Sequence, residues 1–163
     1  MNDFYAGFER DVLFIGCRHQ TGPLSARTRL LEAIMSKIEV DIVNSADRAE
    51  RNQIWSDMPK YYHSSKVVID ISHFWDNPGY CSGRYWYTAT LGACAVTKWF
   101  PGCEDFFPDG IKWYFNSVEG AVKTIKGLLD KPKLRELTKK SASEYAWRNH
   151  TYKQRFEQMV NCL

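Results

Sequence analysis

The segment Ser82-Gly83-Arg84 has the residue types of an anion-binding turn. Ser82 is suited to cap a short helix over residues 83–91, which Gly92 would end. The first turn of a helix presents unpaired N–H groups and a partial positive charge, and both attract phosphate. Gly83 would let the backbone approach such a ligand closely, and Arg84 could add a bidentate contact. An ordinary capped helix with a solvent-facing arginine explains the same residues, so both interpretations stay open here.

Basic residues also surround the end of the first apolar run. Arg18 and His19 follow it, and Arg27 and Arg29 lie at the start of the next helical pattern. Cations near a helix N-terminus are unfavourable by ~0.3–1 kcal/mol, and a bound anion would explain their presence. A charged helix face exposed to solvent explains them equally well. The residues alone leave these two explanations open.

Apolar runs and helical patterns alternate along the chain. Strands are expected at residues 11–17, 40–43, 66–72, 93–97 and 111–115, and helices at residues 24–38, 83–91, 118–129, 132–145 and 152–160. The segment 47–65 is expected to be helical with an interruption at Pro59. Thr151 and Gln154 fit a capping box that opens the last helix.

This order predicts an α/β fold, namely a Rossmann-like, doubly wound, mainly parallel sheet of five or six strands. Helices would cover both faces, and further helices would follow at the C-terminus. In such sheets, ligands bind beyond the carboxyl ends of the strands, where the strand order reverses. The loops at residues 17–23 and 73–82 would lie at that edge. The candidate anion-binding residues are therefore expected to face one edge of the sheet.

Length and composition limit the class of protein. We predict a single domain over residues 1–163, because 163 residues leave no room for a second domain. A net charge of +3 gives no indication of a nucleic-acid partner. The five cysteines lack the spacing of a zinc site, and no apolar run reaches the ~20 residues of a membrane span. No signal peptide is visible at the N-terminus, so we expect a cytoplasmic protein with reduced thiols and no bound metal.

Two further groups of side chains are expected to be structural. Aromatic residues in the middle of the chain should form core, or in part cover an interface with another domain or a second copy. They are Trp75, Tyr80, Tyr85, Trp86, Trp99, Phe100, Phe106 and Phe107. The basic side chains of residues 131–140 should form a solvated helix face.

Four stretches of the chain resemble the C-terminal, nucleotide-sugar-binding domain of group 1 glycosyltransferases with the GT-B fold, in the branch of spore-maturation-type proteins. They are YHSSKVVIDIS (residues 62–72), GRYWYTATLGA (residues 83–93), FPGCEDFFPDG (residues 100–110) and NHTYKQRF (residues 149–156). Residues 11–16 also suit the strand that opens this domain, so the resemblance spans nearly the whole chain. The order and spacing of the stretches make the resemblance specific.

The resemblance implies one half of a GT-B enzyme, which grips the diphosphate of a nucleotide-sugar donor. Family members carry an arginine at the position of Arg84, and the loop after the first strand closes over the phosphates from the other side. The implied diphosphate-binding residues are Ser82, Gly83, Arg84, Arg18, His19 and Arg27. GT-B enzymes typically need no metal, because helix dipoles and basic side chains stabilise the leaving diphosphate. The nucleotide sugar is thus a substrate, and no cofactor is expected.

Ribose recognition is where the chain departs from the family pattern. The family usually has a glutamate three residues after the arginine, and this glutamate binds the ribose hydroxyls. Tyr87 occupies that position here, and Asp76 is the only acidic candidate earlier in the loop. The Tyr87 phenol could still hydrogen-bond a hydroxyl, or it could pack against the sheet.

A complete GT-B enzyme also has an acceptor-binding half. This chain begins almost at the first strand of the donor-binding half, so we expect the acceptor half to be a separate polypeptide or domain. No catalytic residue is predicted, because Ser72, His73 and Cys81 lack the elbow of a nucleophilic site. The alternative function is a non-catalytic, degenerate nucleotide-sugar-binding or scaffold module, which Tyr87 favours.

Overall fold

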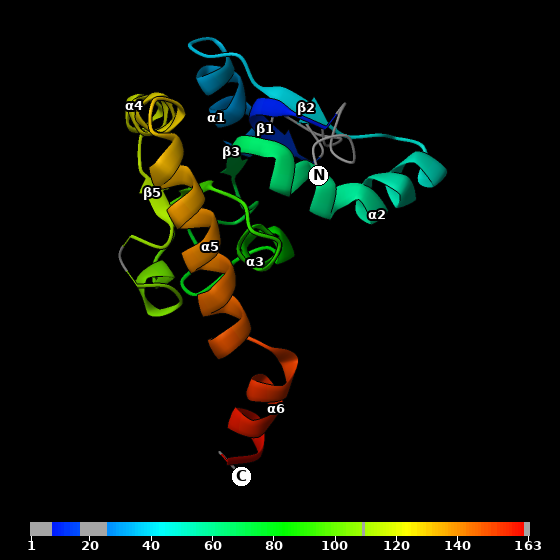
Figure 1. Cartoon of the computed structure of the whole chain (residues 1–163), viewed down its shortest axis with the longest axis vertical. Helices are drawn as coiled ribbons and strands as arrows, with labels where there is room; N and C mark the ends of the chain where they lie inside the picture. The colour runs from blue at the N-terminus through cyan, green and yellow to red at the C-terminus, as the bar shows by residue number, and fades with distance from the viewer. Residues whose placement is uncertain (1–7, 17–25, 109, 162–163) are drawn as a thin grey trace.

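The structure is a computed structural model that describes residues 8–16, 26–108 and 110–161. Its strands form one sheet and are β1 (Arg10–Ile15), β2 (Asp41–Val43), β3 (Ser65–Asp70), β4 (Ala95–Lys98) and β5 (Trp113–Phe115). Neighbouring strands are all parallel, in the order β2-β1-β3-β4-β5 (Figure 1). The predicted parallel α/β sheet is confirmed, with five strands in the described part of the chain.

Helices alternate with the strands and continue beyond them. They are α1 (Ala26–Met35), α2 (Arg48–Ser64), α3 (Gly83–Thr90), α4 (Val118–Leu129), α5 (Pro132–Asn149) and α6 (Tyr152–Asn161), with a short 3-10 turn, η2 (Cys103–Asp105). The described part of the chain ends with α6, which extends away from the sheet (Figure 1). Among the described residues, no helix combines the length and the apolar character needed to cross a membrane.

Strand side chains point alternately into two apolar layers, because successive residues of a strand face opposite sides of the sheet. Val12 and Phe14 of β1 pack with α1 and α4. Leu13 and Ile15 pack with α2, whose Tyr62 is fully buried. Helices therefore cover both faces, as the doubly wound pattern predicts.

The predicted aromatic cluster is mostly core. Tyr85 is fully buried and makes edge-to-face contacts with Trp86, Phe100 and Phe107. These side chains join α3 to α5. Tyr80 is the exception within the cluster, since 36% of it is exposed.

The strand order reverses between β1 and β3. The chain leaves β1 towards β2 on one side and leaves β3 towards β4 on the other. Because α1 and α3 follow these two strands, their N-termini lie at the carboxyl edge of the sheet on either side of this reversal. We call this region, between the carboxyl ends of β1 and β3, the crevice.

Several helices begin or end at the capping residues that the sequence suggests. The Thr151 N–H donates to Oε1 of Gln154 at 2.7 Å, and the Gln154 N–H donates to Oγ1 of Thr151 at 3.4 Å, which completes the capping box. Ser117 caps α4 by accepting the N–H of Gly120 at 3.0 Å. Gly92 follows α3 with φ of 69°, in the left-handed region that favours glycine.

Two local expectations are wrong. The helix α2 runs through Pro59 without interruption, because buried side chains on both sides of this exposed proline hold the helix against the sheet. Arg135 does not belong to a solvated face. It is buried, and its Nη1 donates to the carbonyls of Leu128 at 2.7 Å and Leu129 at 2.6 Å. Arg135 thereby gives the Leu129 carbonyl, at the last residue of α4, a donor, and it adds a second donor to the Leu128 carbonyl, which also accepts the Lys131 N–H.

Candidate functional site

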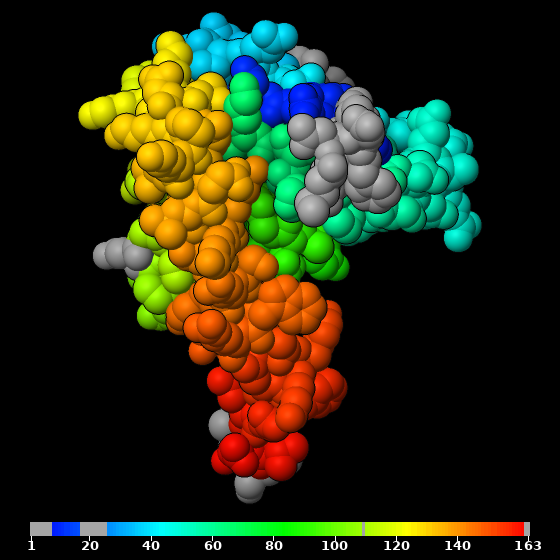
Figure 2. All heavy atoms as spheres, viewed as in Figure 1, coloured from blue at the N-terminus to red at the C-terminus, as the bar shows by residue number. Residues whose placement is uncertain are grey.

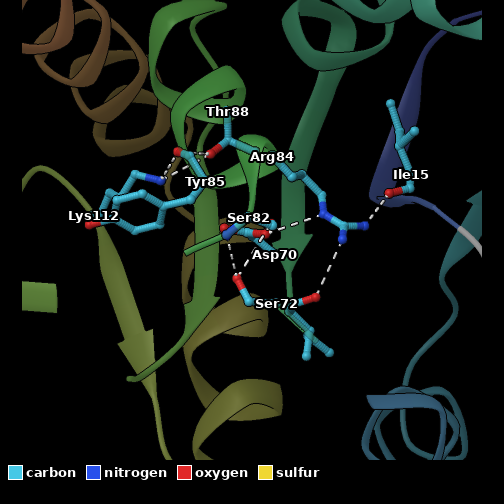
Figure 3. Close-up of polar contacts among 9 residues, drawn as sticks. Ile15, Asp70, Ser72, Ser82, Arg84, Tyr85, Thr88 and Lys112 are labelled. Carbon is cyan, nitrogen blue, oxygen red and sulfur yellow. Dashed lines mark hydrogen bonds and ion pairs between the residues drawn. The ribbon is translucent and has the colours of Figure 1, made fainter. Parts of the chain in front are cut away.

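Arg84, in the first turn of α3, reaches across the carboxyl ends of β1 and β3 (Figure 3). Its Nη1 donates to the carbonyl of Ile15 at 2.5 Å, and its Nη2 donates to the carbonyl of Ile71 at 3.5 Å. Its Nε lies 3.4 Å from a carboxylate oxygen of Asp70. The side chain is only 14% exposed, and these contacts hold the guanidinium at the edge of the sheet. The interpretation of Arg84 as a solvent-facing arginine is therefore wrong.

Asp70 is fully buried at the end of β3, and two cations act on its carboxylate. The first is Arg84, and the second is Lys112, which is itself buried. The Lys112 Nζ donates to the carbonyl of Tyr85 at 2.6 Å and to Oγ1 of Thr88 at 3.0 Å (Figure 3). Burial lowers the pKa of Lys112 to about 8, and the Asp70 carboxylate opposes this shift. Lys112 stays largely protonated at neutral pH, so two positive charges face one carboxylate.

Ser82 occupies the N-cap position of α3, but the predicted side-chain cap is wrong. Its N–H donates to Oγ of Ser72 at 3.1 Å, and the two hydroxyl oxygens lie 3.4 Å apart. The first backbone hydrogen bond of the turn runs from the Tyr85 N–H to the Ser82 carbonyl at 2.9 Å. The N–H groups of Gly83 and Arg84 precede this bond, so they are the ones that α3 can offer to a ligand.

A cavity of about 410 Å³ opens beside this turn. The first turn of α3, including Arg84, forms one wall, and α2 forms the other. Tyr87 and Trp55 meet edge-to-face across it, with ring centroids 5.8 Å apart. Ser45 and Arg51 add polar groups to the lining. The volume is within the range of small-molecule binding sites, which start at roughly 300 Å³.

The structure brings some predicted site residues together and separates others. Ser82, Gly83, Arg84 and Tyr87 all line the cavity. Asp76 is exposed, its charge acts on Lys98, and it is not among the described residues of the lining. Tyr87 thus lies in the cavity without Asp76 beside it.

The basic residues that follow the first strand differ in burial. Arg27 is buried in the first turn of α1, so the solvated-face explanation fails for it. That explanation holds for Arg29, which is exposed. Arg18 and His19 lie outside the described residues, so their predicted role stays a prediction.

Sequence reasoning missed Asp70 and Lys112. Each has a recognisable signal, which is a charge next to apolar strand residues, since Asp70 ends β3 and Lys112 directly precedes β5. A charge in such a position needs a partner, because an isolated buried charge is very costly.

No cluster of three or more His, Cys, Asp or Glu side chains in residues 8–16, 26–108 and 110–161 could hold a metal ion. Cys81, Cys94 and Cys103 are free thiols.

Gly16 makes room for the Arg84 guanidinium. A Cβ at Gly16 would overlap Nη1 of Arg84, and the φ of 147° is one that side chains rarely adopt. We expect Gly16→Ala to lower the free energy of unfolding by about 1–3 kcal/mol, measured by urea denaturation. Gly127→Ala is the matched control, because its Cβ would meet no atom within 4 Å, and it should stabilise α4 by ~0.5–1 kcal/mol. Equal effects of the two substitutions would contradict the contact.

Lys112 should make stability depend on pH in the alkaline range. Its pKa is about 8 in the folded protein against 10.5 ordinarily, so the unfolded chain binds more protons between these values. Relative to Lys112→Met, the wild type should therefore gain up to about 3 kcal/mol of unfolding free energy as the pH rises from 8 to 10.5. The control is Lys123→Met, at an exposed position of α4, which should show no such divergence. Parallel pH curves for wild type and Lys112→Met would refute the burial cost.

Comparisons with known proteins agree with this architecture. Among solved structures, the crystal structure of TarM is similar, with a TM-score of 0.53 and 10% sequence identity. The similarity covers 93% of this chain and 34% of the TarM chain, so the present chain spans about a third of that protein. No curated protein matches the sequence significantly. The sequence profile of the glycosyl transferase-like family matches residues 18–161. The chain therefore belongs to the glycosyl transferase-like family.

Proposed function

We propose that the chain is the donor-binding half of a GT-B glycosyltransferase and binds the diphosphate of a nucleotide sugar. The observation that carries this proposal is the position of Arg84. Its guanidinium lies at the carboxyl edge where the strand order reverses, and it borders a cavity of about 410 Å³. The charge balance of Arg84, Lys112 and Asp70 is also positive, which suits an anion.

The lining of the cavity suggests how the donor would bind. The nucleoside would occupy the space between α2 and α3, against the rings of Trp55 and Tyr87. The diphosphate would lie at the first turn of α3 and accept hydrogen bonds from the N–H groups of Gly83 and Arg84. Tyr87, 40% exposed, would offer its hydroxyl to the ribose.

Glycosyl transfer breaks the bond between the anomeric carbon of the sugar and a diphosphate oxygen. Negative charge then grows on the leaving diphosphate. The N-terminus of α3 and the guanidinium of Arg84 would stabilise this charge, because their dipoles are already fixed before the reaction. We assign no catalytic base among the described residues. The role proposed for this chain in the reaction is to bind the donor and to stabilise the leaving group.

The acceptor would be bound by a partner domain or a separate polypeptide, and self-association is the alternative. Support comes from α6, which has no buried residue and projects from the body of the molecule (Figure 2). Tyr152, Phe156, Met159 and Val160 lie on one stripe of this helix, and each is at least 64% exposed. Apolar stripes of this kind mark interaction surfaces in proteins.

Arg84→Lys tests the proposed diphosphate site. Lysine keeps the charge near Asp70 but loses the planar fork that can contact two carbonyls and a phosphate together. We expect the affinity for uridine, guanosine or adenosine diphosphate, whichever binds best, to fall by about 1.5 kcal/mol in calorimetry.

The matched control is Arg148→Lys, because the Arg148 side chain is 76% exposed on α5. This variant should bind as the wild type does. A wild-type chain that binds none of the three nucleotides would overturn the proposed function.

A second candidate function, a non-catalytic module of the same fold, is favoured by Tyr87 in place of the family glutamate. Tyr87→Glu separates the two functions. If the pocket is intact, the carboxylate should strengthen binding of nucleoside diphosphates by ~1–2 kcal/mol through the ribose, while inorganic pyrophosphate should bind as before. A folded Tyr87→Glu variant without any nucleotide affinity would favour the non-catalytic module.

A further inference from the structure

The hydroxyl group of Tyr62 is buried without a hydrogen-bond partner. The side chain is fully buried in the last turn of α2, and its Oη bonds to no atom of the described residues. An unpaired buried hydroxyl costs free energy, and most buried polar groups in folded proteins are paired. A ligand that supplies the missing partner would remove this cost.

Tyr62 also borders the cavity of about 410 Å³ between α2 and α3. The other residues of α2 that line the cavity are Arg51, Ile54, Trp55 and Met58, so the lining follows one face of the helix. Side chains of a helix lean toward its N-terminus. The Tyr62 ring therefore extends from the end of α2 back toward Met58 and the cavity.

The cavity becomes more enclosed along this face of α2. Trp55 is 57% exposed, Met58 is 5% exposed, and Tyr62 is not exposed at all. Met58 and Tyr62 share a buried apolar cluster with Ile15, and Val43 packs against this cluster. Ile15 and Val43 line the cavity too. The inner end of the cavity is therefore an apolar recess, and the unpaired Tyr62 hydroxyl lies in its wall.

Burial also determines the protonation state of this hydroxyl. It raises the pKa of Tyr62, and the positive charge of Arg84 opposes the shift only in part. The phenol is therefore neutral at physiological pH. A neutral hydroxyl can donate one hydrogen bond and can also accept.

The chemistry of the recess favours the base over the other parts of a nucleotide. A nucleobase has apolar ring faces and carries its hydrogen-bonding groups on its edges. Ribose has several hydroxyls and a phosphate is charged, so in an apolar recess most of their polar atoms would lack partners. Binding sites for small molecules commonly combine an apolar lining with a few polar groups that fix the orientation of the ligand.

We infer that Tyr62 recognises the edge of the donor's nucleobase, which lies at the inner end of the cavity. This inference rests on the proposed function and adds a residue that determines specificity for the base. The base would pack against Ile15 and Met58, and its edge would form a hydrogen bond with the Tyr62 hydroxyl. The ribose would follow near Tyr87 and the diphosphate at the first turn of α3, in the order in which a nucleotide carries these groups.

Tyr62→Phe tests this contact, because it removes the hydroxyl and keeps the ring. The probes are uridine, guanosine and adenosine diphosphates and inorganic pyrophosphate, measured by calorimetry with the full chain. We expect the affinity for the nucleotide that binds best to fall about fivefold, as for one lost hydrogen bond. The affinity for pyrophosphate should stay unchanged, because pyrophosphate has no base.

Tyr61→Phe is the matched control. Tyr61 precedes Tyr62 on α2, but it is not among the described residues that line the cavity. This variant should bind both the nucleotide and pyrophosphate as the wild type does.

A dideoxy nucleotide separates a contact with the base from one with the ribose. The 2′,3′-dideoxy form of the nucleotide that binds best lacks both ribose hydroxyls and keeps the base. The fivefold difference between wild type and Tyr62→Phe should persist with this probe. A difference that disappears would assign the Tyr62 hydroxyl to the ribose and would refute the contact with the base.

Thermal unfolding of the ligand-free protein tests whether the hydroxyl is unpaired. The Tm of Tyr62→Phe should equal or exceed that of the wild type, because a buried hydroxyl without a partner contributes only its desolvation cost. A lower Tm would mean that the hydroxyl already has a partner within the protein, and the inference would then be wrong.

The outcomes distinguish the role of Tyr62 from the function on which it rests. Nucleotide binding that is equally strong in wild type and Tyr62→Phe overturns the role of Tyr62 and leaves the donor-binding function intact. Failure of the wild type to bind any of the three nucleotides overturns both. A loss confined to Tyr62→Phe and to probes that carry a base supports both.

Discussion

The hydrogen bonds from Arg84 to the carbonyls of Ile15 and Ile71 are the constraint on which the candidate site depends. Parallel strands end in carbonyls at one edge of the sheet, and Ile15 and Ile71 lie at the ends of the two strands between which the order reverses. A guanidinium satisfies several acceptors at once because its donors lie in a fixed plane. Arg84 thereby ties α3 to both central strands and places a cation at the reversal.

This placement imposes requirements on the surrounding residues. Asp70 must lie close to Arg84, and Gly16 must lack a side chain so that the guanidinium fits. Lys112 also holds α3 in place, because its Nζ donates a hydrogen bond to the Tyr85 carbonyl. Buried charges of this kind stabilise a fold only when each finds a partner. The contacts that build the crevice are therefore the same contacts that give it a positive charge.

The two helix N-termini at the crevice are the physical basis for proposing an anionic ligand there. The helices α1 and α3 both begin at this edge, and each brings a partly or fully buried arginine in its first turn. The cavity between α2 and α3 offers aromatic and polar groups beside this edge of the sheet. This combination of groups is the reason for proposing a ligand with a ring system and a diphosphate. The exposed stripe of α6 lies apart from this edge of the sheet (Figure 1).

The sequence by itself determined the α/β class, the parallel order of elements and most helix ends, because these follow from local periodicity and capping residues such as Thr151 and Gln154. It also placed Arg84 at the edge of the sheet. Tertiary structure alone decided which residues share that edge. Asp70 and Lys112 are 42 residues apart in the chain, yet their charges interact. The buried side chain of Arg135 donates hydrogen bonds to carbonyls at the end of α4. The helix α2 continues through Pro59. Such outcomes depend on long-range burial and charge pairing, which no local pattern of residues encodes.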